Sequence, residues 1–112
     1  MVDTYIPKRG DIVWLNFSPQ LGHEQAGLRP ALVLSPIVYN QKSGMMLACP
    51  ITSKIKQYPF EVRIKTKKID GVILADQVKS LDWRERKPKL DGVADTETIS
   101  RTQGLIESLV SG

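Results

Sequence analysis

The stretch HEQAGLRPALVLSP, residues 23–36, joins a polar loop to an apolar run within a few residues. Its first half holds Glu24, Gln25 and a glycine, and its second half has the apolar, β-branched composition of a strand. Arg29 stands at the boundary, and Pro30 after it biases the backbone of Arg29 toward an extended conformation. The pattern therefore predicts a strand that begins at a cationic side chain, next to a loop that carries a carboxylate.

Short apolar runs of this kind recur along most of the chain. Together with the opening stretch they are DIVWLNF (11–17), RPALVLS (29–35), MMLACPI (45–51), FEVRI (60–64) and GVILADQ (71–77). The segments between them, PIVYNQKSG among them, carry the Gly, Pro, Asn or Asp that turns favour. We therefore expect five or more strands in a strongly bent sheet or small barrel, joined by turns.

The end of the chain changes its period. Apolar residues and one threonine recur at three and four residues from Ile99 to Val110, and Asp95 or Thr96 precedes them as a capping residue. This pattern predicts a closing amphipathic helix. SLDWRERK (80–87) is short enough to hold only one further helical turn, with Trp83 as its buried anchor.

Size and composition indicate a single domain over residues 1–112. No apolar run approaches the roughly 20 residues that span a bilayer, and the N-terminus lacks the apolar core of a signal peptide. We therefore expect a cytoplasmic protein without a membrane partner. A lone cysteine, Cys49, lies within an apolar run and is expected to be a small buried hydrophobe.

Positive charge is concentrated in one part of the chain. The net charge is +4, and eleven of the sixteen Lys and Arg residues fall between Lys54 and Lys89. Such a segment suits a polyanionic partner such as RNA, and a merely solvated face fits it equally well.

The sequence lacks the usual cofactor signatures. One histidine and one cysteine cannot form a His/Cys metal site, and no Gly-rich phosphate loop or Asp-x-Asp pair occurs. We expect neither a metal nor a cofactor, so any chemistry would use Glu, Asp, Arg, Thr or Ser side chains, or His23.

Five segments in order, KRGDIVWLNFSP, EQAGLRPALVLSP, YNQKSGMMLACPIT, YPFEV and GVILADQVKSLDWR, resemble the MazF/PemK family of toxin endoribonucleases. The resemblance covers almost the whole chain. It implies a mainly β (α+β) fold, an SH3-like, strongly bent antiparallel barrel of the MazF, PemK and CcdB toxin type with a C-terminal helix.

The same resemblance implies the activity and the partners. Such toxins of type II toxin–antitoxin systems cut single-stranded mRNA at short sequence motifs without metal, which inhibits translation and growth. The ribose 2′-hydroxyl attacks the phosphorus, leaving a 2′,3′-cyclic phosphate and a 5′-hydroxyl. The family also implies a homodimer and a MazE-like antitoxin with an acidic tail, and contact with DNA only indirectly through the antitoxin complex.

Residue roles follow from the chemistry and from the family. Arg29 offers a guanidinium for phosphate oxygens, Thr52 matches the catalytic threonine of the family, and Glu24 is the candidate general base. Which of Glu24, Arg29 and Asp76 acts as acid or base stays open, as does a contribution from His23. Contacts to RNA are expected from seven residues: Phe17, Asn40, Ser53, Lys56, Asp76, Gln77 and Lys79.

Two other functions compete with this hypothesis. A non-catalytic RNA-binding barrel would share the basic segment and Phe17, but would not need Arg29 and Thr52 together. A gyrase-targeting toxin of the same fold depends on a tryptophan near its C-terminus, where this chain reads IESLVSG.

Overall fold

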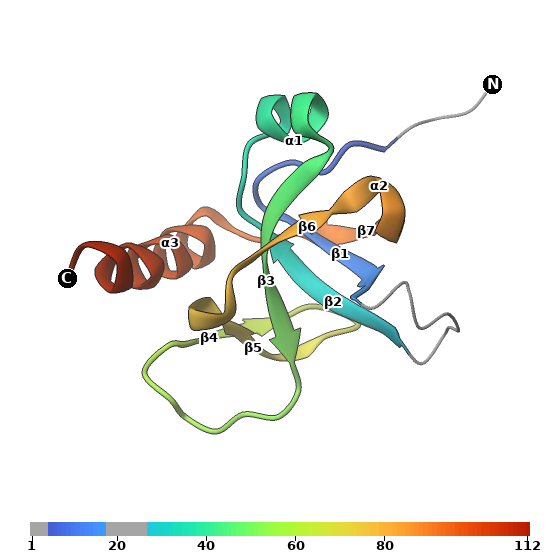
Figure 1. The fold of residues 1–112 in the computed structure, drawn as a ribbon. Helices are drawn as coiled ribbons and strands as arrows, with labels where there is room; N and C mark the ends of the chain where they lie inside the picture. Colours follow the sequence, from blue (N-terminus) through green and yellow to red (C-terminus); the bar gives the residue numbers. More distant parts are fainter. Residues whose placement is uncertain (1–4, 18–26) are drawn as a thin grey trace.

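The computed structural model describes residues 5–17 and 27–112 as a bent antiparallel sheet with helices at its margins (Figure 1). The elements are β1 (Asp11–Asn16), β2 (Leu28–Val33), α1 (Ile37–Ser43), β3 (Met45–Thr52), β4 (Glu61–Lys65), β5 (Asp70–Leu74), the 3₁₀ turn η3 (Ala75–Gln77), β6 (Lys79–Asp82), α2 (Trp83–Arg86), β7 (Lys89–Val93) and α3 (Thr96–Ser111). None of the helices in these two ranges is long and apolar enough to cross a membrane.

Strand β3 is the central strand of the sheet and pairs with β2, β5 and β6. The strand order is β4-β5-β3-β2-β1-β7, and β6 pairs with β3 outside this path. The first half of β3 pairs with β6, from Met45 opposite Asp82 to Ala48 opposite Lys79, whereas its end pairs with β5, where Thr52 lies opposite Val72. One strand thus carries two successive neighbours, and the sheet bends around it (Figure 1).

The bend encloses apolar side chains on both faces of the central strands. On β1, Ile12 belongs to one core and Val13 and Leu15 belong to another. The first core is closed by Leu105 and Ile106 of α3, and the second is closed by Trp83 and the segment before β1. Burial on both faces explains why the sequence shows continuous apolar runs instead of a strict alternation.

The structure confirms the two predicted helical segments, α2 and α3, at the expected positions. Helix α3 begins after Asp95, whose carboxylate accepts a hydrogen bond from the Thr98 N–H at 2.8 Å, and this bond lowers the pKa of Asp95. Asp82 caps α2 in the same way through the Glu85 N–H, and Trp83 is buried. These caps satisfy N–H groups that a helix end otherwise leaves unpaired.

Four elements differ from the expectation. The segment PIVYNQKSG, which was expected to be a turn, contains helix α1. The run 71–77 was expected to be one strand, but β5 ends at Leu74 and the next three residues form η3. Strands β6 and β7 were not predicted. Helix α1 has no side-chain cap at Pro36, and β7, KLDGV, has too few apolar residues to show a strand pattern. Both elements depend on tertiary contacts that a local pattern does not contain.

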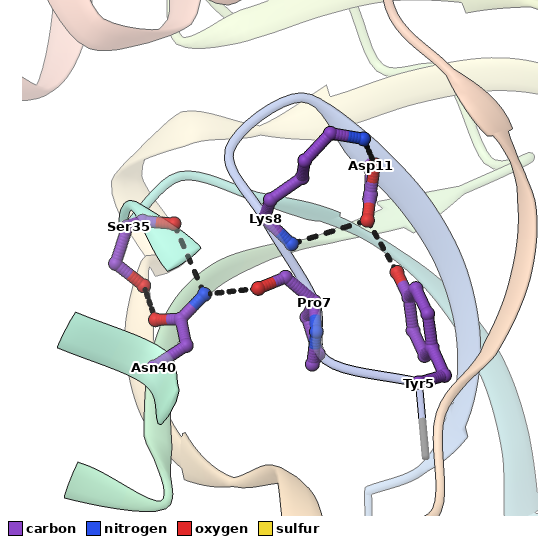
Figure 2. A network of polar contacts seen from close by, with 6 residues as sticks. All are labelled: Tyr5, Pro7, Lys8, Asp11, Ser35 and Asn40. Atoms are coloured by element: carbon purple, nitrogen blue, oxygen red, sulfur yellow. Dashed lines mark hydrogen bonds and ion pairs between the residues drawn. The ribbon is translucent and has the colours of Figure 1, made fainter. Parts of the chain in front are cut away.

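Asn40 provides the main contact that holds α1 in place (Figure 2). Its side-chain amide donates to the carbonyls of Pro7 at 2.8 Å and Ser35 at 3.1 Å, and its Oδ1 accepts from Ser35 Oγ at 2.5 Å. The Trp83 indole N–H donates to the Asn40 carbonyl at 2.8 Å. The Asn40 side chain is completely buried, so its predicted contact with RNA is wrong in this structure.

A second network anchors the segment before β1 (Figure 2). The buried Asp11 accepts hydrogen bonds from the Tyr5 hydroxyl and from the Lys8 N–H, and pairs with Lys8 Nζ at 3.3 Å. Burial, together with the bond to Asp11, raises the pKa of Tyr5. A buried carboxylate is stable only with such partners, so this network fixes the start of β1.

Cys49 lies fully buried in β3, as the sequence predicted. Burial first, and then the negative charge of Asp76, raises the pKa of its thiol to about 12. The thiol therefore stays protonated near neutral pH and packs as a small apolar group.

We expect Asn40→Ala to lower the free energy of unfolding by about 2 kcal/mol or more, because the substitution leaves buried partners unpaired. Urea denaturation followed by circular dichroism measures this change. Gln41→Ala on the exposed face of the same helix is the control and should change stability by less than about 0.5 kcal/mol. Equal stability of the two variants would contradict a structural role for Asn40.

Candidate active site

The site opens where two central strands stop pairing. Strands β2 and β3 pair from Ala31 opposite Pro50 to Val33 opposite Ala48, and no further. Beyond that point a cavity of about 320 Å³ lies between the strand ends and the start of β5. We call it the Arg29 hollow; it is lined by Trp14, Leu28, Arg29, Pro30, Ile51, Thr52, Ser53, Lys54, Lys68, Ile69 and Asp70.

A smaller cavity of about 170 Å³ adjoins it and shares Thr52 and Lys54. We call it the Gln77 hollow; its other residues are Lys56, Tyr58, Glu61, Leu74, Asp76 and Gln77. The Thr52–Lys54 segment therefore separates two cavities, each of which contains residues predicted from the sequence.

Arg29 is held by its strand while its side chain is exposed. In the β1–β2 register it lies opposite Leu15, which is fully buried. A rigid backbone with an exposed guanidinium limits the motion of the charge relative to a bound phosphate. The predicted cationic side chain at a strand start is therefore confirmed in position.

Thr52 ends β3 and is half-buried, with its hydroxyl oriented by the backbone. Its Oγ1 accepts a hydrogen bond from the Lys54 N–H at 3.1 Å. Because that N–H occupies one acceptor position of the hydroxyl, the O–H proton remains free to donate. Donation toward the cavity suits a phosphate oxygen.

Gly71 contributes to the site, although sequence reasoning did not identify it. A Cβ at this position would lie 2.9 Å from the carbonyl carbon of Thr52 and 3.1 Å from Cα of Ser53, and closer still to the Thr52 carbonyl oxygen. Only glycine permits β5 to approach β3 this closely. The signal available in the sequence was a glycine inside an apolar strand run.

Arg63 holds the same part of β5 from the neighbouring strand. Its guanidinium donates to the Gly71 carbonyl at 2.9 Å and pairs with the Asp70 carboxylate at 2.8 Å. Strand β5 is thus paired with β3 and also held by Arg63 of β4, and both contacts keep Gly71 close to Thr52.

The loop that follows β3 is ordered by a carboxylate. Glu61 accepts hydrogen bonds from the backbone N–H groups of Lys56, at 3.1 Å, and Gln57, at 2.8 Å. Lys56 also lies over the Tyr58 ring, 5.8 Å from its centre. These contacts bring Lys56 to the Gln77 hollow, where Asp76 and Gln77 of η3 also lie.

Phe17 and Lys79 form a separate pair. Lys79 Nζ lies 5.6 Å from the centre of the half-buried Phe17 ring, and neither residue lines the two hollows. Arg86 donates to the carbonyls of Asn16 at 3.1 Å and Phe17 at 2.5 Å, which fixes the end of β1.

The structure therefore groups some predicted residues and separates others. Arg29, Thr52 and Ser53 line the Arg29 hollow, and Lys56, Asp76 and Gln77 line the adjoining one. Glu24 and His23 lie outside the described residues. In the described part of the chain, no group of three or more His, Cys, Asp and Glu side chains is placed to hold a metal ion.

A small bent β-barrel with a cationic, hydroxyl-bearing cavity between strand ends is a scaffold suited to phosphodiester chemistry. Residues 8–109 match the family model described as PemK-like, MazF-like toxin of type II toxin–antitoxin systems. The chain belongs to this family, as its sequence motifs indicated.

Relatives with known functions agree with the assignment. The endoribonuclease toxin MazF of Escherichia coli K12 is 47% identical over 110 residues, which cover 98% of this chain and 99% of that protein. The endoribonuclease toxin ChpB of the same strain is 37% identical, with 89% and 94% covered.

Solved structures agree as well. Deinococcus radiodurans MazF has a TM-score of 0.86 at 48% identity, covering 97% of this chain and 100% of that one. A MazE–MazF complex from that organism has the same TM-score at 43% identity, covering 96% and 98%. The chain is thus an endoribonuclease toxin of a toxin–antitoxin system with the predicted barrel fold.

We expect Gly71→Ala to lower kcat for RNA cleavage by roughly 10²-fold, because the added methyl group displaces the backbone of Thr52. Steady-state cleavage of a short RNA measures the effect, and circular dichroism checks the fold. Gly92→Ala in β7 is the matched control, since a Cβ there meets nothing within 4 Å. A folded Gly71→Ala enzyme with unchanged kcat would exclude the positioning role of Gly71.

Proposed function

We propose that the chain cuts single-stranded RNA, mRNA in the cell, without a metal ion, by attack of a ribose 2′-hydroxyl on the adjacent phosphorus. The products would be a 2′,3′-cyclic phosphate and a 5′-hydroxyl. The observation that carries this proposal is that Arg29 and Thr52 line one cavity at the ends of two paired strands. They supply a fixed positive charge and a hydroxyl donor for the same phosphate.

Each residue has a role in the transition state. As the phosphorus becomes five-coordinate, negative charge grows on its oxygens, and the Arg29 guanidinium stabilises that charge through two N–H donors. Thr52 donates its hydroxyl proton to one of these oxygens, since the Lys54 N–H orients the group. Because both groups are preorganised, neither requires reorientation as the charge develops.

Proton transfer requires an acceptor for the 2′-hydroxyl proton and a donor for the 5′-oxygen. Glu24 is our candidate base, in the segment before β2. Asp76 is a second candidate, because it lines the hollow that shares Thr52 with the Arg29 hollow. Arg29 is the third candidate for the general base or the general acid.

The first test uses a long RNA in the presence of EDTA. We expect cleavage at defined single-stranded motifs at an unchanged rate, with 5′-hydroxyl ends that ligate only after phosphorylation. The same RNA with a 2′-deoxy nucleotide at the cut site should resist cleavage, since the nucleophile is gone. Strict dependence on Mg²⁺, or 5′-phosphate products, would contradict the mechanism.

The second test removes the two groups separately. We expect Arg29→Ala and Thr52→Ala each to lower kcat by about 10²-fold or more, because each removes a group that stabilises the transition state. Thr52→Ser keeps the hydroxyl and should retain most activity. Arg101→Ala, in the exposed part of α3, controls for the loss of one positive charge. A folded Ala variant as active as the wild type would exclude that residue from the site.

A homodimer is the second part of the proposal. Helix α1 and the adjacent strand β3 expose a set of large apolar side chains: Ile37 40%, Val38 58%, Tyr39 45% and Leu47 42%. Leu47 lies next to the start of α1, because its N–H donates a hydrogen bond to the Oγ of Ser35, two residues before the helix. A surface of this kind favours association, and stable interfaces commonly cover about 800 Å² on each partner.

We expect sedimentation at micromolar concentration to give a dimer, and Val38→Glu to give a folded monomer because a charge is placed in the apolar interface. Val110→Glu is the control, since Val110 is 82% exposed near the end of α3. A wild-type monomer, or a Val38→Glu dimer as stable as the wild type, would rule out this face as the interface.

The remaining partner is a MazE-like antitoxin, which we propose by analogy with the MazE–MazF complex of Deinococcus radiodurans. An acidic segment of the antitoxin would compete with RNA for the cationic side chains around the two hollows. Contact with DNA would arise only through that complex, and the cytoplasm is the compartment in which mRNA and antitoxin are both present.

A further inference from the structure

The two walls of the Arg29 hollow belong to separate parts of the sheet. One wall comes from β1 and β2, where Trp14 lies opposite Pro30. The other wall comes from the end of β3 and the turn into β5, where Thr52 and Lys68 stand. The pairing of β2 with β3 stops before the hollow. The separation of the two walls, and with it the separation of Arg29 from Thr52, therefore depends on other contacts.

An ion pair between the two ends of the sheet joins these walls. Within the described residues the strand order ends at β4 on one side and at β7 on the other. Lys68, in the turn between β4 and β5, pairs through Nζ with the carboxylate of Asp91 in β7 at 3.7 Å. Because β7 is paired with β1, this contact links the second wall of the hollow to the first.

Strand β7 is irregular at Asp91. The two neighbours of this residue, Leu90 and Gly92, lie opposite consecutive residues of β1, so Asp91 is the extra residue of a β-bulge. A bulge changes the direction of a side chain relative to a regular strand. The Asp91 side chain is 5% exposed, and a buried carboxylate requires a charged or hydrogen-bonded partner. The bulge and the burial together indicate that this carboxylate is directed toward its partner across the sheet.

The turn that carries Lys68 is ordered by its own hydrogen bonds. The Thr66 N–H donates to the Ile69 carbonyl at 2.7 Å, and Thr66 Oγ1 accepts from the N–H groups of Lys68 at 3.2 Å and Ile69 at 3.0 Å. Shortly after the turn, Gly71 lies against the backbone of Thr52. A restraint on Lys68 therefore acts on Thr52 through a short, hydrogen-bonded segment.

We propose that Asp91 is a positioning residue of the active site. Its carboxylate holds Lys68 and thereby keeps the two walls of the hollow at the separation at which Arg29 and Thr52 contact the same phosphate. This inference rests on the proposed function of those two residues. Asp91 does not itself line the hollow, so it acts through Lys68. The competing explanation is that Lys68 binds a phosphate directly, and the experiment distinguishes the two.

The first measurement is single-turnover cleavage of a short RNA with the enzyme in excess, which separates the cleavage rate from RNA binding. We expect Asp91→Asn to lower the maximal rate by about tenfold and to change the half-saturating enzyme concentration by less than about twofold, because a small displacement of catalytic groups slows the reaction without removing contacts to RNA. Glu97→Gln, at an exposed position in the first turn of α3, is the matched control and should leave both values unchanged. Rates are compared at a temperature at which circular dichroism shows every variant to be folded.

Reversal of the pair separates the contact from the charge of Lys68. Lys68→Glu combined with Asp91→Lys restores an ion pair between the same two segments, but places a carboxylate at the rim of the hollow. We expect the double variant to reach a maximal rate within about threefold of the wild type, although each single substitution lowers that rate by about tenfold or more, because partners in contact have non-additive effects.

The salt dependence of binding tests the competing explanation without a cleavage step. The ligand is an uncleavable RNA with a 2′-deoxy nucleotide at the cut site. We expect Lys68→Met to leave the slope of log Kd against log salt concentration unchanged, because the Lys68 charge is paired with Asp91. A slope reduced by about 0.7 would mean that Lys68 neutralises a phosphate, and it would overturn the proposal.

Two other results would also overturn it. One is a folded Asp91→Asn enzyme that cuts RNA at the wild-type rate. The other is a reversed pair that is no faster than the faster of its two single variants. A wild type that does not cut RNA would instead refute the proposed function.

Discussion

The structure depends on the way strand β3 is paired along one edge. Buried backbone N–H and C=O groups must be hydrogen-bonded, so the strand cannot leave part of this edge without a partner. Here β6 pairs with the first half of β3 and β5 with its end, while β2 follows the other edge. The sheet bends where one short partner of β3 replaces the other, and its apolar side chains form two cores in place of one flat face.

The candidate site is a consequence of the same pairing. Thr52 is the last residue of β3 and is held by β5, whose Gly71 lies against the Thr52 backbone. Arg29 stands where β2 has lost contact with β3 and is still held by β1. The two candidate side chains thus extend from the ends of rigid strands, and the cavity between them exists because the pairing stops there.

Charge in this chain has structural as well as functional uses. Of the basic residues between Lys54 and Lys89, Arg63 and Lys68 pair with aspartates, and Arg84 and Arg86 donate to backbone carbonyls. Exposed ion pairs of this kind add little stability, but they fix the direction of side chains near the site. Of the eleven basic residues in this segment, only Lys54, Lys56 and Lys68 line the hollows.

The sequence by itself determined the elements whose pattern is local. Apolar runs located β1 to β5 within a few residues, the capping aspartate located α3, and the family motifs gave Arg29 and Thr52 as candidate site residues. The tertiary structure alone decided the rest. Helix α1 is held by the buried contacts of Asn40, β6 and β7 are strands because β3 and β1 need partners there, and Gly71 is required by a contact with a residue nineteen positions earlier. These features depend on atoms that meet only after the chain has bent, so a local pattern cannot contain them.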